Sequence, residues 1–157
     1  MNKDFVNIYN NLINLTRNKD LFKIFTNKDT FSDRLLIFMF HMGFFLRNFK
    51  SQIDKKYLQS FYDYTFRQIE LSIREIGYGD QTVNKKMKTY VNILYSIIGK
   101  IDLWDVLSNR EKTKILKYYL LIENNDDELI KYFDKYVEYL GKISFNSFAK
   151  SVIDHRF

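Results

Sequence analysis

The sequence predicts an all-α protein, and three observations carry that prediction. Apolar residues recur at helical spacing along nearly the whole chain, its 157 residues include no proline, and alternating strand patterns with hairpin turns are missing. Proline is the commonest helix breaker, so its absence favours long helices. The length suits one domain with a substantial core, and no repeat or Gly/Ser linker divides the chain. We therefore predict a single domain over residues 1–157, a bundle of about six to eight helices.

The N-terminal residues predict two helices. The apolar stripe of the first consists of Phe5, Ile8, Tyr9, Leu12, Ile13 and Leu15. A shorter second helix is predicted from Leu21, Phe22, Ile24 and Phe25.

Residues 33–50 are expected to form the apolar central helix of the bundle. They contain the twelve-residue apolar run Leu35–Leu46, flanked by Arg34 and Arg47. A membrane span needs about 20 such residues, and His41 interrupts this run. A helix that is apolar all round is typical of the centre of a bundle, so we interpret the segment as a core helix rather than a membrane span. We interpret His41 as a core histidine bonded to a neighbouring carbonyl, rather than a haem ligand.

Two long helices and a helical C-terminal part follow. Residues 54–76 carry an apolar stripe of Leu58, Phe61, Tyr62, Thr65, Ile69, Ile73 and Ile76. The next helix is striped by Val83, Met87, Tyr90, Val91, Leu94 and Ile98. Ser108 and Glu111 match a capping box that opens a further helix. Residues 124–128 are expected to end that helix and cap another, which runs to Gly141, and a short helix is expected over 145–153.

The connection between the two long helices has the most distinctive residue pattern in the chain. It begins at Arg74 and Glu75, and Gly77 and Gly79 can both adopt positive φ; the first suits the position just past a helix end. Asp80 or Thr82 could then accept the free N–H groups of the next helix.

The next helix begins with a cluster of cations around one methionine: Lys85, Lys86, Met87 and Lys88. Cations are disfavoured at this end of a helix dipole, and such a local misfit is typical of a binding site. The segment is therefore either a binding site or a helix–turn–helix corner with a purely structural role. Lysines on a solvated turn can equally have no function.

The charge is unevenly distributed. Residues 1–100 carry 16 Lys and Arg against 9 Asp and Glu, a net +7, whereas residues 101–157 carry 9 against 10, a net −1. A basic N-terminal part indicates an anionic partner such as ribosomal RNA, a lipid surface or an acidic protein; the alternative is a lysine-rich surface that serves solubility.

The composition leaves little support for an enzyme. The chain contains no cysteine and two histidines, which excludes disulfides and thiolate metal sites, and it has no P-loop, nucleophile elbow or dinucleotide fingerprint. We therefore predict no catalytic residues, no cofactor and no metal site. The N-terminal residues lack the pattern of a secretory signal or a mitochondrial presequence, which indicates a bacterial cytoplasm.

The order of residues in the connection carries a family resemblance. Arg-Glu-x-Gly-x-Gly-Asp followed by Lys-Lys-Met-Lys, within Arg74–Lys88, resembles the signature of the ubiquinol-cytochrome c chaperone family. The resemblance is best from Phe31 to about Tyr95, with Phe31–Arg34 as a first block and Phe61–Lys88 as a second. It fits only loosely from Leu120 onward.

The resemblance implies a non-enzymatic assembly chaperone. Such a protein would bind newly made cytochrome b and promote its incorporation into the respiratory ubiquinol-cytochrome c reductase, or bc complex. The implied partners are cytochrome b, possible contacts with the ribosome and a second small assembly factor, and the inner-membrane surface, but no DNA. The implied location is the cytoplasmic face of the bacterial inner membrane, or the mitochondrial matrix in a eukaryote. The expected client-binding residues are Arg74, Glu75, Gly77, Gly79, Asp80, Lys85, Lys86, Met87 and Lys88. The alternative is a basic helical module that binds ribosomes, RNA or membrane surfaces without a cytochrome client.

Overall fold

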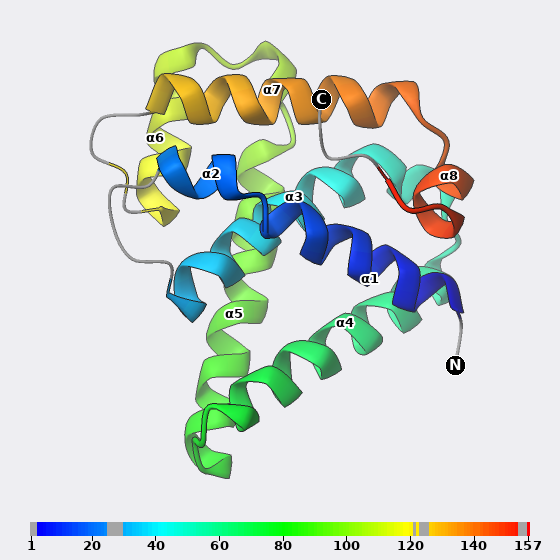
Figure 1. Ribbon diagram of the computed structural model, residues 1–157, viewed down its shortest axis with the longest axis vertical. Helices are drawn as coiled ribbons and strands as arrows, with labels where there is room; N and C mark the ends of the chain where they lie inside the picture. The colour runs from blue at the N-terminus through cyan, green and yellow to red at the C-terminus, as the bar shows by residue number, and fades with distance from the viewer. Residues whose placement is uncertain (1–2, 25–29, 121, 123–125, 154–156) are drawn as a thin grey trace.

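The computed structural model describes residues 3–24, 30–120, 122, 126–153 and 157, and its secondary structure over these residues is entirely helical (Figure 1). This confirms the predicted all-α class and the helical bundle. The helices are α1 (Lys3–Thr16), α2 (Lys19–Ile24), α3 (Phe31–Phe49), α4 (Lys55–Glu75), α5 (Asp80–Ile101), α6 (Asn109–Tyr119), α7 (Asp126–Lys142) and α8 (Phe145–Lys150), with 3-10 turns η1 (Lys50–Gln52) and η2 (Trp104–Val106). Residues 25, 124 and 125, for which we predicted helix or cap positions, lie outside the described part.

The predicted central helix is α3, which packs against α1, α5 and α7. It begins two residues earlier than expected because Thr30 and Asp33 form a capping box. The Thr30 hydroxyl oxygen accepts from the Asp33 N–H at 3.2 Å, and the Asp33 carboxylate accepts from the Thr30 N–H at 3.4 Å. Every residue from Ile37 to Leu46 is buried, which confirms a core helix. Among the described residues, no helix is both long and apolar enough to cross a membrane.

Gly43 allows α3 and α5 to approach closely. A Cβ atom added to Gly43 would lie 3.2 Å from Cδ1 of Ile101 and 3.3 Å from Cγ2 of Ile97. Distances this short require a neighbouring side chain to shift, so a larger residue would push the two helices apart. This crossing fixes the upper part of α5 against the core.

His41 is a fully buried core histidine, as predicted. Its Nδ1 lies 2.9 Å from the Ile37 carbonyl oxygen and its Nε2 lies 2.5 Å from the Tyr132 hydroxyl. Because a carbonyl only accepts hydrogen bonds, Nδ1 carries the proton and Nε2 accepts from Tyr132. Burial lowers the pKa of His41 from 6.5 to about 3, although the bond to Ile37 acts in the opposite direction. The imidazole is therefore neutral at physiological pH.

The C-terminal helix α8 is held to α1 by a buried amide. Asn11 donates to the carbonyl oxygens of Phe148 and Ser151, both at 2.8 Å. Its own carbonyl oxygen accepts from the Ile153 N–H at 3.4 Å. α8 ends at Lys150 rather than at Ile153 as expected, because the next residues run extended to make these bonds.

The two longest helices, α4 and α5, meet in a corner that projects from the bundle (Figure 1). Apart from α5, the main neighbour of α4 is α1, whereas α5 also packs against α3. The far ends of both helices extend below the other helices in this view, and the segment between them forms the lower tip of the molecule. The fold therefore presents the predicted client-binding segment at its most prominent end.

Candidate functional site

The turn between α4 and α5 depends on one glycine. Gly77 has φ +108°, a conformation that side-chain-bearing residues rarely adopt, and its N–H donates to the Arg74 carbonyl at 2.9 Å. The positive φ expected at Gly77 is thus present. Gly79 has φ −73° and precedes α5 as its N-cap, so its backbone conformation is open to any residue. The two glycines therefore differ in the strain that a side chain would introduce.

Asp80 does not cap α5, contrary to the expectation from the sequence. It is the first residue of the helix, Thr82 lies further inside, and the N-cap Gly79 has no side chain to accept a hydrogen bond. The Asp80 carboxylate instead pairs with the guanidinium of Arg74 across the corner. A favourable charge contact with the end of α4 replaces the local cap.

Arg74 belongs to a chain of ion pairs that ties the corner together. Besides Asp80, it contacts Glu70 at 3.0 Å, and Glu70 also contacts Arg67 at 2.8 Å. Hydrogen bonds from Arg67 and Arg74 lower the pKa of Glu70, and bonds to Asp80 and Glu70 raise the pKa of Arg74. Arg74 thus positions the two helices, in addition to any contact it makes with a partner.

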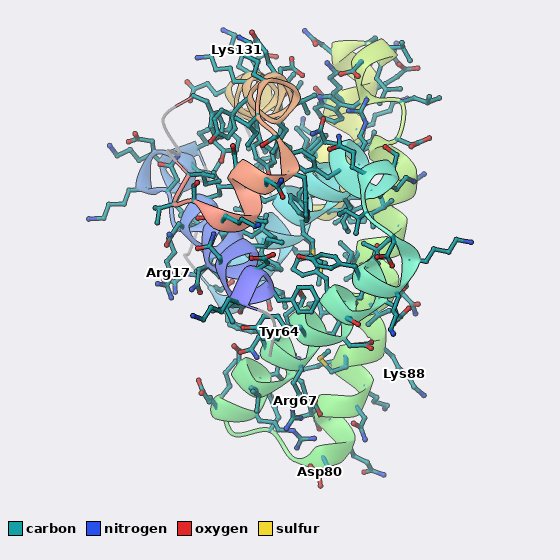
Figure 2. The ribbon with its side chains drawn as sticks, turned by 90° about the vertical axis from the view of Figure 1, so that its right-hand side faces the viewer. Arg17, Tyr64, Arg67, Asp80, Lys88 and Lys131 are labelled. Carbon is teal, nitrogen blue, oxygen red and sulfur yellow. The ribbon has the colours of Figure 1, made fainter. Side chains whose placement is uncertain are left out.

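The lysines of the site fall into two groups. Lys85 and Lys88 are exposed, three residues apart on α5, and Figure 2 shows Lys88 projecting from the edge of the molecule. Lys86 is half-buried, with its Nζ 4.7 Å from the ring centre of Tyr78. Met87 is half-buried against the core. Free cationic charge at this end of α5 is therefore carried mainly by Lys85 and Lys88.

The corner also exposes apolar side chains that the sequence did not predict as site residues. Ile76, expected in the buried stripe, is 50% exposed because α4 ends there; Tyr78 is 42% exposed. Phe31, at the start of α3, is 36% exposed and lines the same small cleft of about 220 Å³ as Ile76 and Tyr78. Phe31 begins the first block of the family resemblance, which was the available signal for it.

A second, larger cleft lies between α4 and α5 beside the lysines. Its volume is about 560 Å³, and its lining combines Phe66 and Met87 with charged groups that include Arg67 and Lys88. The two clefts flank the corner with mixed apolar and charged surfaces. Such a surface suits contact with a protein segment that is partly apolar and partly charged.

Within the described residues, no three His, Asp or Glu side chains are placed to hold a metal ion. The polar groups of the corner are instead engaged with one another or exposed to solvent.

Comparison with known protein families gives a match over most of the chain. A family model described as ubiquinol-cytochrome C chaperone matches residues 23–154. This range is wider than the resemblance from Phe31 to Tyr95 and includes most of the C-terminal part that fitted only loosely. No curated protein and no solved structure matched the chain.

Proposed function

The chain belongs to the ubiquinol-cytochrome C chaperone family, and on that basis we propose that it is a non-enzymatic assembly chaperone that binds newly made cytochrome b. The observation that carries this proposal is the family match over residues 23–154, which contains the whole α4–α5 corner. The family implies a role in assembly of the bc complex, and the identity of the client is our proposal. Binding would favour incorporation of cytochrome b into that complex.

The corner is our candidate for the client contact. Ile76 and Tyr78 offer apolar area at the tip, and aromatic side chains bring large contact areas at a low cost in rotamer entropy. Lys85 and Lys88 add positive charge that suits acidic loops of a client. Arg74 and Asp80 form an ion pair between the two helices beside these groups.

We test the charged part of the site with the double variant Lys85→Glu/Lys88→Glu in a strain that lacks the chromosomal gene. Both side chains are exposed, so folding is expected to be unchanged, while client binding is lost through charge repulsion. The measurement is the reduced-minus-oxidised spectrum of the membranes, with immunodetection of cytochrome b. We expect the cytochrome b signal to fall to that of the deletion strain.

The matched control is Lys114→Glu/Lys117→Glu on α6. These lysines have the same three-residue spacing, are also exposed, and undergo the same change of charge at another part of the molecule. The control is expected to restore cytochrome b fully. If both variants restore cytochrome b equally, the lysines of α5 do not contact the client. If deletion of the gene leaves cytochrome b unchanged, cytochrome b is not the client.

The second candidate function is a basic module that binds ribosomes or RNA without a cytochrome client. The exposed pair Lys85 and Lys88 favours it. Phosphate contacts weaken steeply with ionic strength, whereas capture of an apolar client persists. Ribosome sedimentation at low and high salt separates the two functions.

Location and further partners are part of the same proposal. We propose residence at the cytoplasmic face of the bacterial inner membrane, or in the matrix of a mitochondrion, because the client is inserted there. Contacts with the ribosome and with a second small assembly factor would be transient. Cell fractionation followed by affinity capture of the tagged chain tests all three.

A further inference from the structure

The groove between α4 and α5 continues beyond the corner as a row of aromatic side chains. Phe66 and Met87 line the cleft of about 560 Å³ that flanks the corner. The Phe66 ring stacks on the ring of Tyr62 with ring centres 6.1 Å apart, and the centre of the Tyr62 ring lies 6.2 Å from that of Tyr95 on α5. Tyr95 is 55% exposed, so the row reaches the surface. The apolar part of the groove therefore extends from the corner toward the bundle.

This groove is long enough for a helical segment rather than a single side chain. Asn84 lines the cleft near the corner, and Tyr95 lies further along α5, about 16 Å away at a rise of about 1.5 Å per residue. The distance corresponds to about three turns of a second helix. Asn84, Lys88 and Tyr95 follow one another at intervals of four and seven residues, so they share one exposed face of α5.

The backbone around the groove favours a helix as the occupant. α4 and α5 are continuous helices, so their interior N–H and C=O groups bond within each helix. An extended peptide laid on the aromatic row would leave its own backbone groups without partners there, and burying such groups is costly. A helix satisfies its backbone internally and presents side chains alone to the groove.

The charge that lacks a partner on the α5 side of the groove is positive. The side chains of Lys85 and Lys88 form no ion pair or hydrogen bond with another described residue. The carboxylate of Glu70, in contrast, pairs with Arg67 at 2.8 Å and with Arg74 at 3.0 Å. An occupant therefore gains most by bringing carboxylates over α5.

The α4 side of the groove carries a carboxylate that sets where acidic residues can lie. Asp63 lines the cleft opposite Lys88 and accepts a hydrogen bond from the Gln59 amide at 2.9 Å, but it forms no ion pair within the described part of the chain. Acidic side chains of an occupant would be repelled by Asp63 and attracted by the lysines. They should therefore lie over α5 and not over α4.

The same features favour a protein helix over a nucleic-acid strand. The rings of Tyr62 and Phe66 already stack on each other at an interplanar angle of 8°, so few open ring faces remain for bases. A phosphate backbone in the groove would also meet the carboxylate of Asp63. Burial raises the pKa of Tyr62 to about 12, so the row itself is uncharged at physiological pH.

We propose that the groove between α4 and α5 receives an amphipathic helix of the client. The apolar face of that helix packs on the row of Tyr62, Phe66 and Tyr95, and its acidic residues lie over α5 against Lys85 and Lys88. This inference deepens the proposed function, because it names the chemistry of the client segment, and it rests on the chain binding a client at the corner. It adds Tyr62 and Tyr95 to the contact surface.

The first test is a methionine-methyl NMR titration of the full chain with a designed helical peptide. The peptide carries Leu along one face and Glu along one flank of that face, and a control peptide carries Lys in place of each Glu. The acidic peptide is expected to shift the methyl signal of Met87 in the groove and to leave Met39 and Met42, buried in α3, unchanged. No shift at Met87, or equal affinity for the two peptides, overturns the proposal.

Charge reversal tests the lysines without depending on a loss of binding alone. Lys85→Glu/Lys88→Glu should weaken binding of the acidic peptide about tenfold or more and should strengthen binding of the Lys peptide, because attraction and repulsion are exchanged. A variant that fails to fold would lose both peptides. The matched control Lys114→Glu/Lys117→Glu on α6 should leave both affinities unchanged. Equal changes in the two double variants would mean that net charge alone decides binding, which contradicts the proposal.

The aromatic row is tested with Tyr95→Ala. Because Tyr95 is 55% exposed, folding should be unchanged, while affinity for the acidic peptide should fall about fivefold or more through the loss of apolar contact area. The matched control is Tyr118→Ala on α6, where the side chain is 78% exposed and the affinity should not change. Unchanged affinity in Tyr95→Ala would place the helix outside the aromatic row and overturn the proposal.

Two other occupants are outcomes of the same titration. A shift of the Met87 signal when the chain is concentrated without peptide would assign the groove to a second copy of the chain. Tighter binding of a single-stranded RNA oligonucleotide than of the acidic peptide, with a shift at Met87, would assign the groove to nucleic acid. Either result overturns the proposal.

Failure of this inference is distinguishable from failure of the proposed function. If deletion of the gene removes cytochrome b but the acidic peptide does not bind, the chaperone function stands and the groove proposal is wrong. If the peptide binds as expected but deletion leaves cytochrome b unchanged, the groove proposal stands and its client is another protein.

Discussion

The core around α3 and the corner between α4 and α5 are stabilised in different ways. In the core, aromatic rings meet on several sides; Phe45, for example, lies within 6 Å of the rings of Phe49, Phe61 and Phe148. In the corner, one glycine conformation and a chain of exposed ion pairs determine the geometry. A buried aromatic side chain of the first kind contributes several kcal/mol through all its contacts together, whereas an exposed ion pair contributes little.

This contrast indicates a division of roles between the two regions. The core can tolerate few changes, because each side chain is in contact with many others. The corner can change its surface residues with little effect on stability, so selection for a partner can act there. Substitutions in the core are therefore expected to change stability, and substitutions in the corner are expected to change binding.

The largest effect is expected from Phe45→Ala. The ring is fully buried, so its removal leaves a cavity and should lower the free energy of unfolding by about 3–5 kcal/mol. The matched aromatic in the corner is Tyr78, which is 42% exposed, and Tyr78→Ala should change stability by no more than about 0.5 kcal/mol. Urea unfolding of both variants measures the difference. Similar losses would mean that the corner is part of the cooperative core.

A pH effect of intermediate size is expected from His41. Its pKa is about 3 in the folded chain and 6.5 when exposed, so the unfolded chain binds the proton more tightly. The free energy of unfolding should therefore fall as the pH decreases from 6.5 toward 3, by at most about 1.4 kcal/mol per pH unit. The contribution is fully present above pH 6.5.

The variant His41→Gln isolates this effect from the titration of carboxylates. Urea unfolding at pH 7.0, 6.0 and 5.0 should give a steeper loss for the parent than for the variant. In the parent, the NMR signals of the His41 imidazole should not titrate between pH 5 and 8. A titration near pH 6.5 would mean that the His41 ring is exposed to solvent. The core around α3 would then be no more closed to water than the corner.

Most of the fold could be predicted from the sequence, because helix capping patterns and the periodicity of apolar residues indicate the same helices that the structure buries. The apolar run around His41 implied a buried helix, and Ser108 with Glu111 implied a capping box that the structure contains. The close approach of α5 to Gly43 could not be predicted, since it depends on which helix crosses α3 at that residue. The early start of α3 follows from a capping box at Thr30 that periodicity alone does not reveal.

The candidate site was less predictable because its residues interact across separate helices. Local rules identified Gly77, but they assigned Asp80 to a cap, whereas the nearby guanidinium of Arg74 competes for the carboxylate. Periodicity placed Ile76 in the core, although the helix ends there and leaves the side chain exposed. The role of the corner lysines stays a prediction.

The smallest effect in this series is expected from a glycine pair within the corner itself. Gly77→Val forces a β-branched residue into φ +108° and should lower the free energy of unfolding by about 1–2 kcal/mol. Gly79→Val makes the same chemical change two residues away, where φ is −73° and no atom lies within 4 Å of an added Cβ, so it should cost less than Gly77→Val, through the preference for glycine over valine at an N-cap alone. Urea unfolding of the two variants, together with hydrogen exchange in the first turn of α5, separates them. Equal stability would show that the corner adapts its backbone to the side chain, and that Arg74 and Asp80, rather than the glycine, fix the angle between α4 and α5.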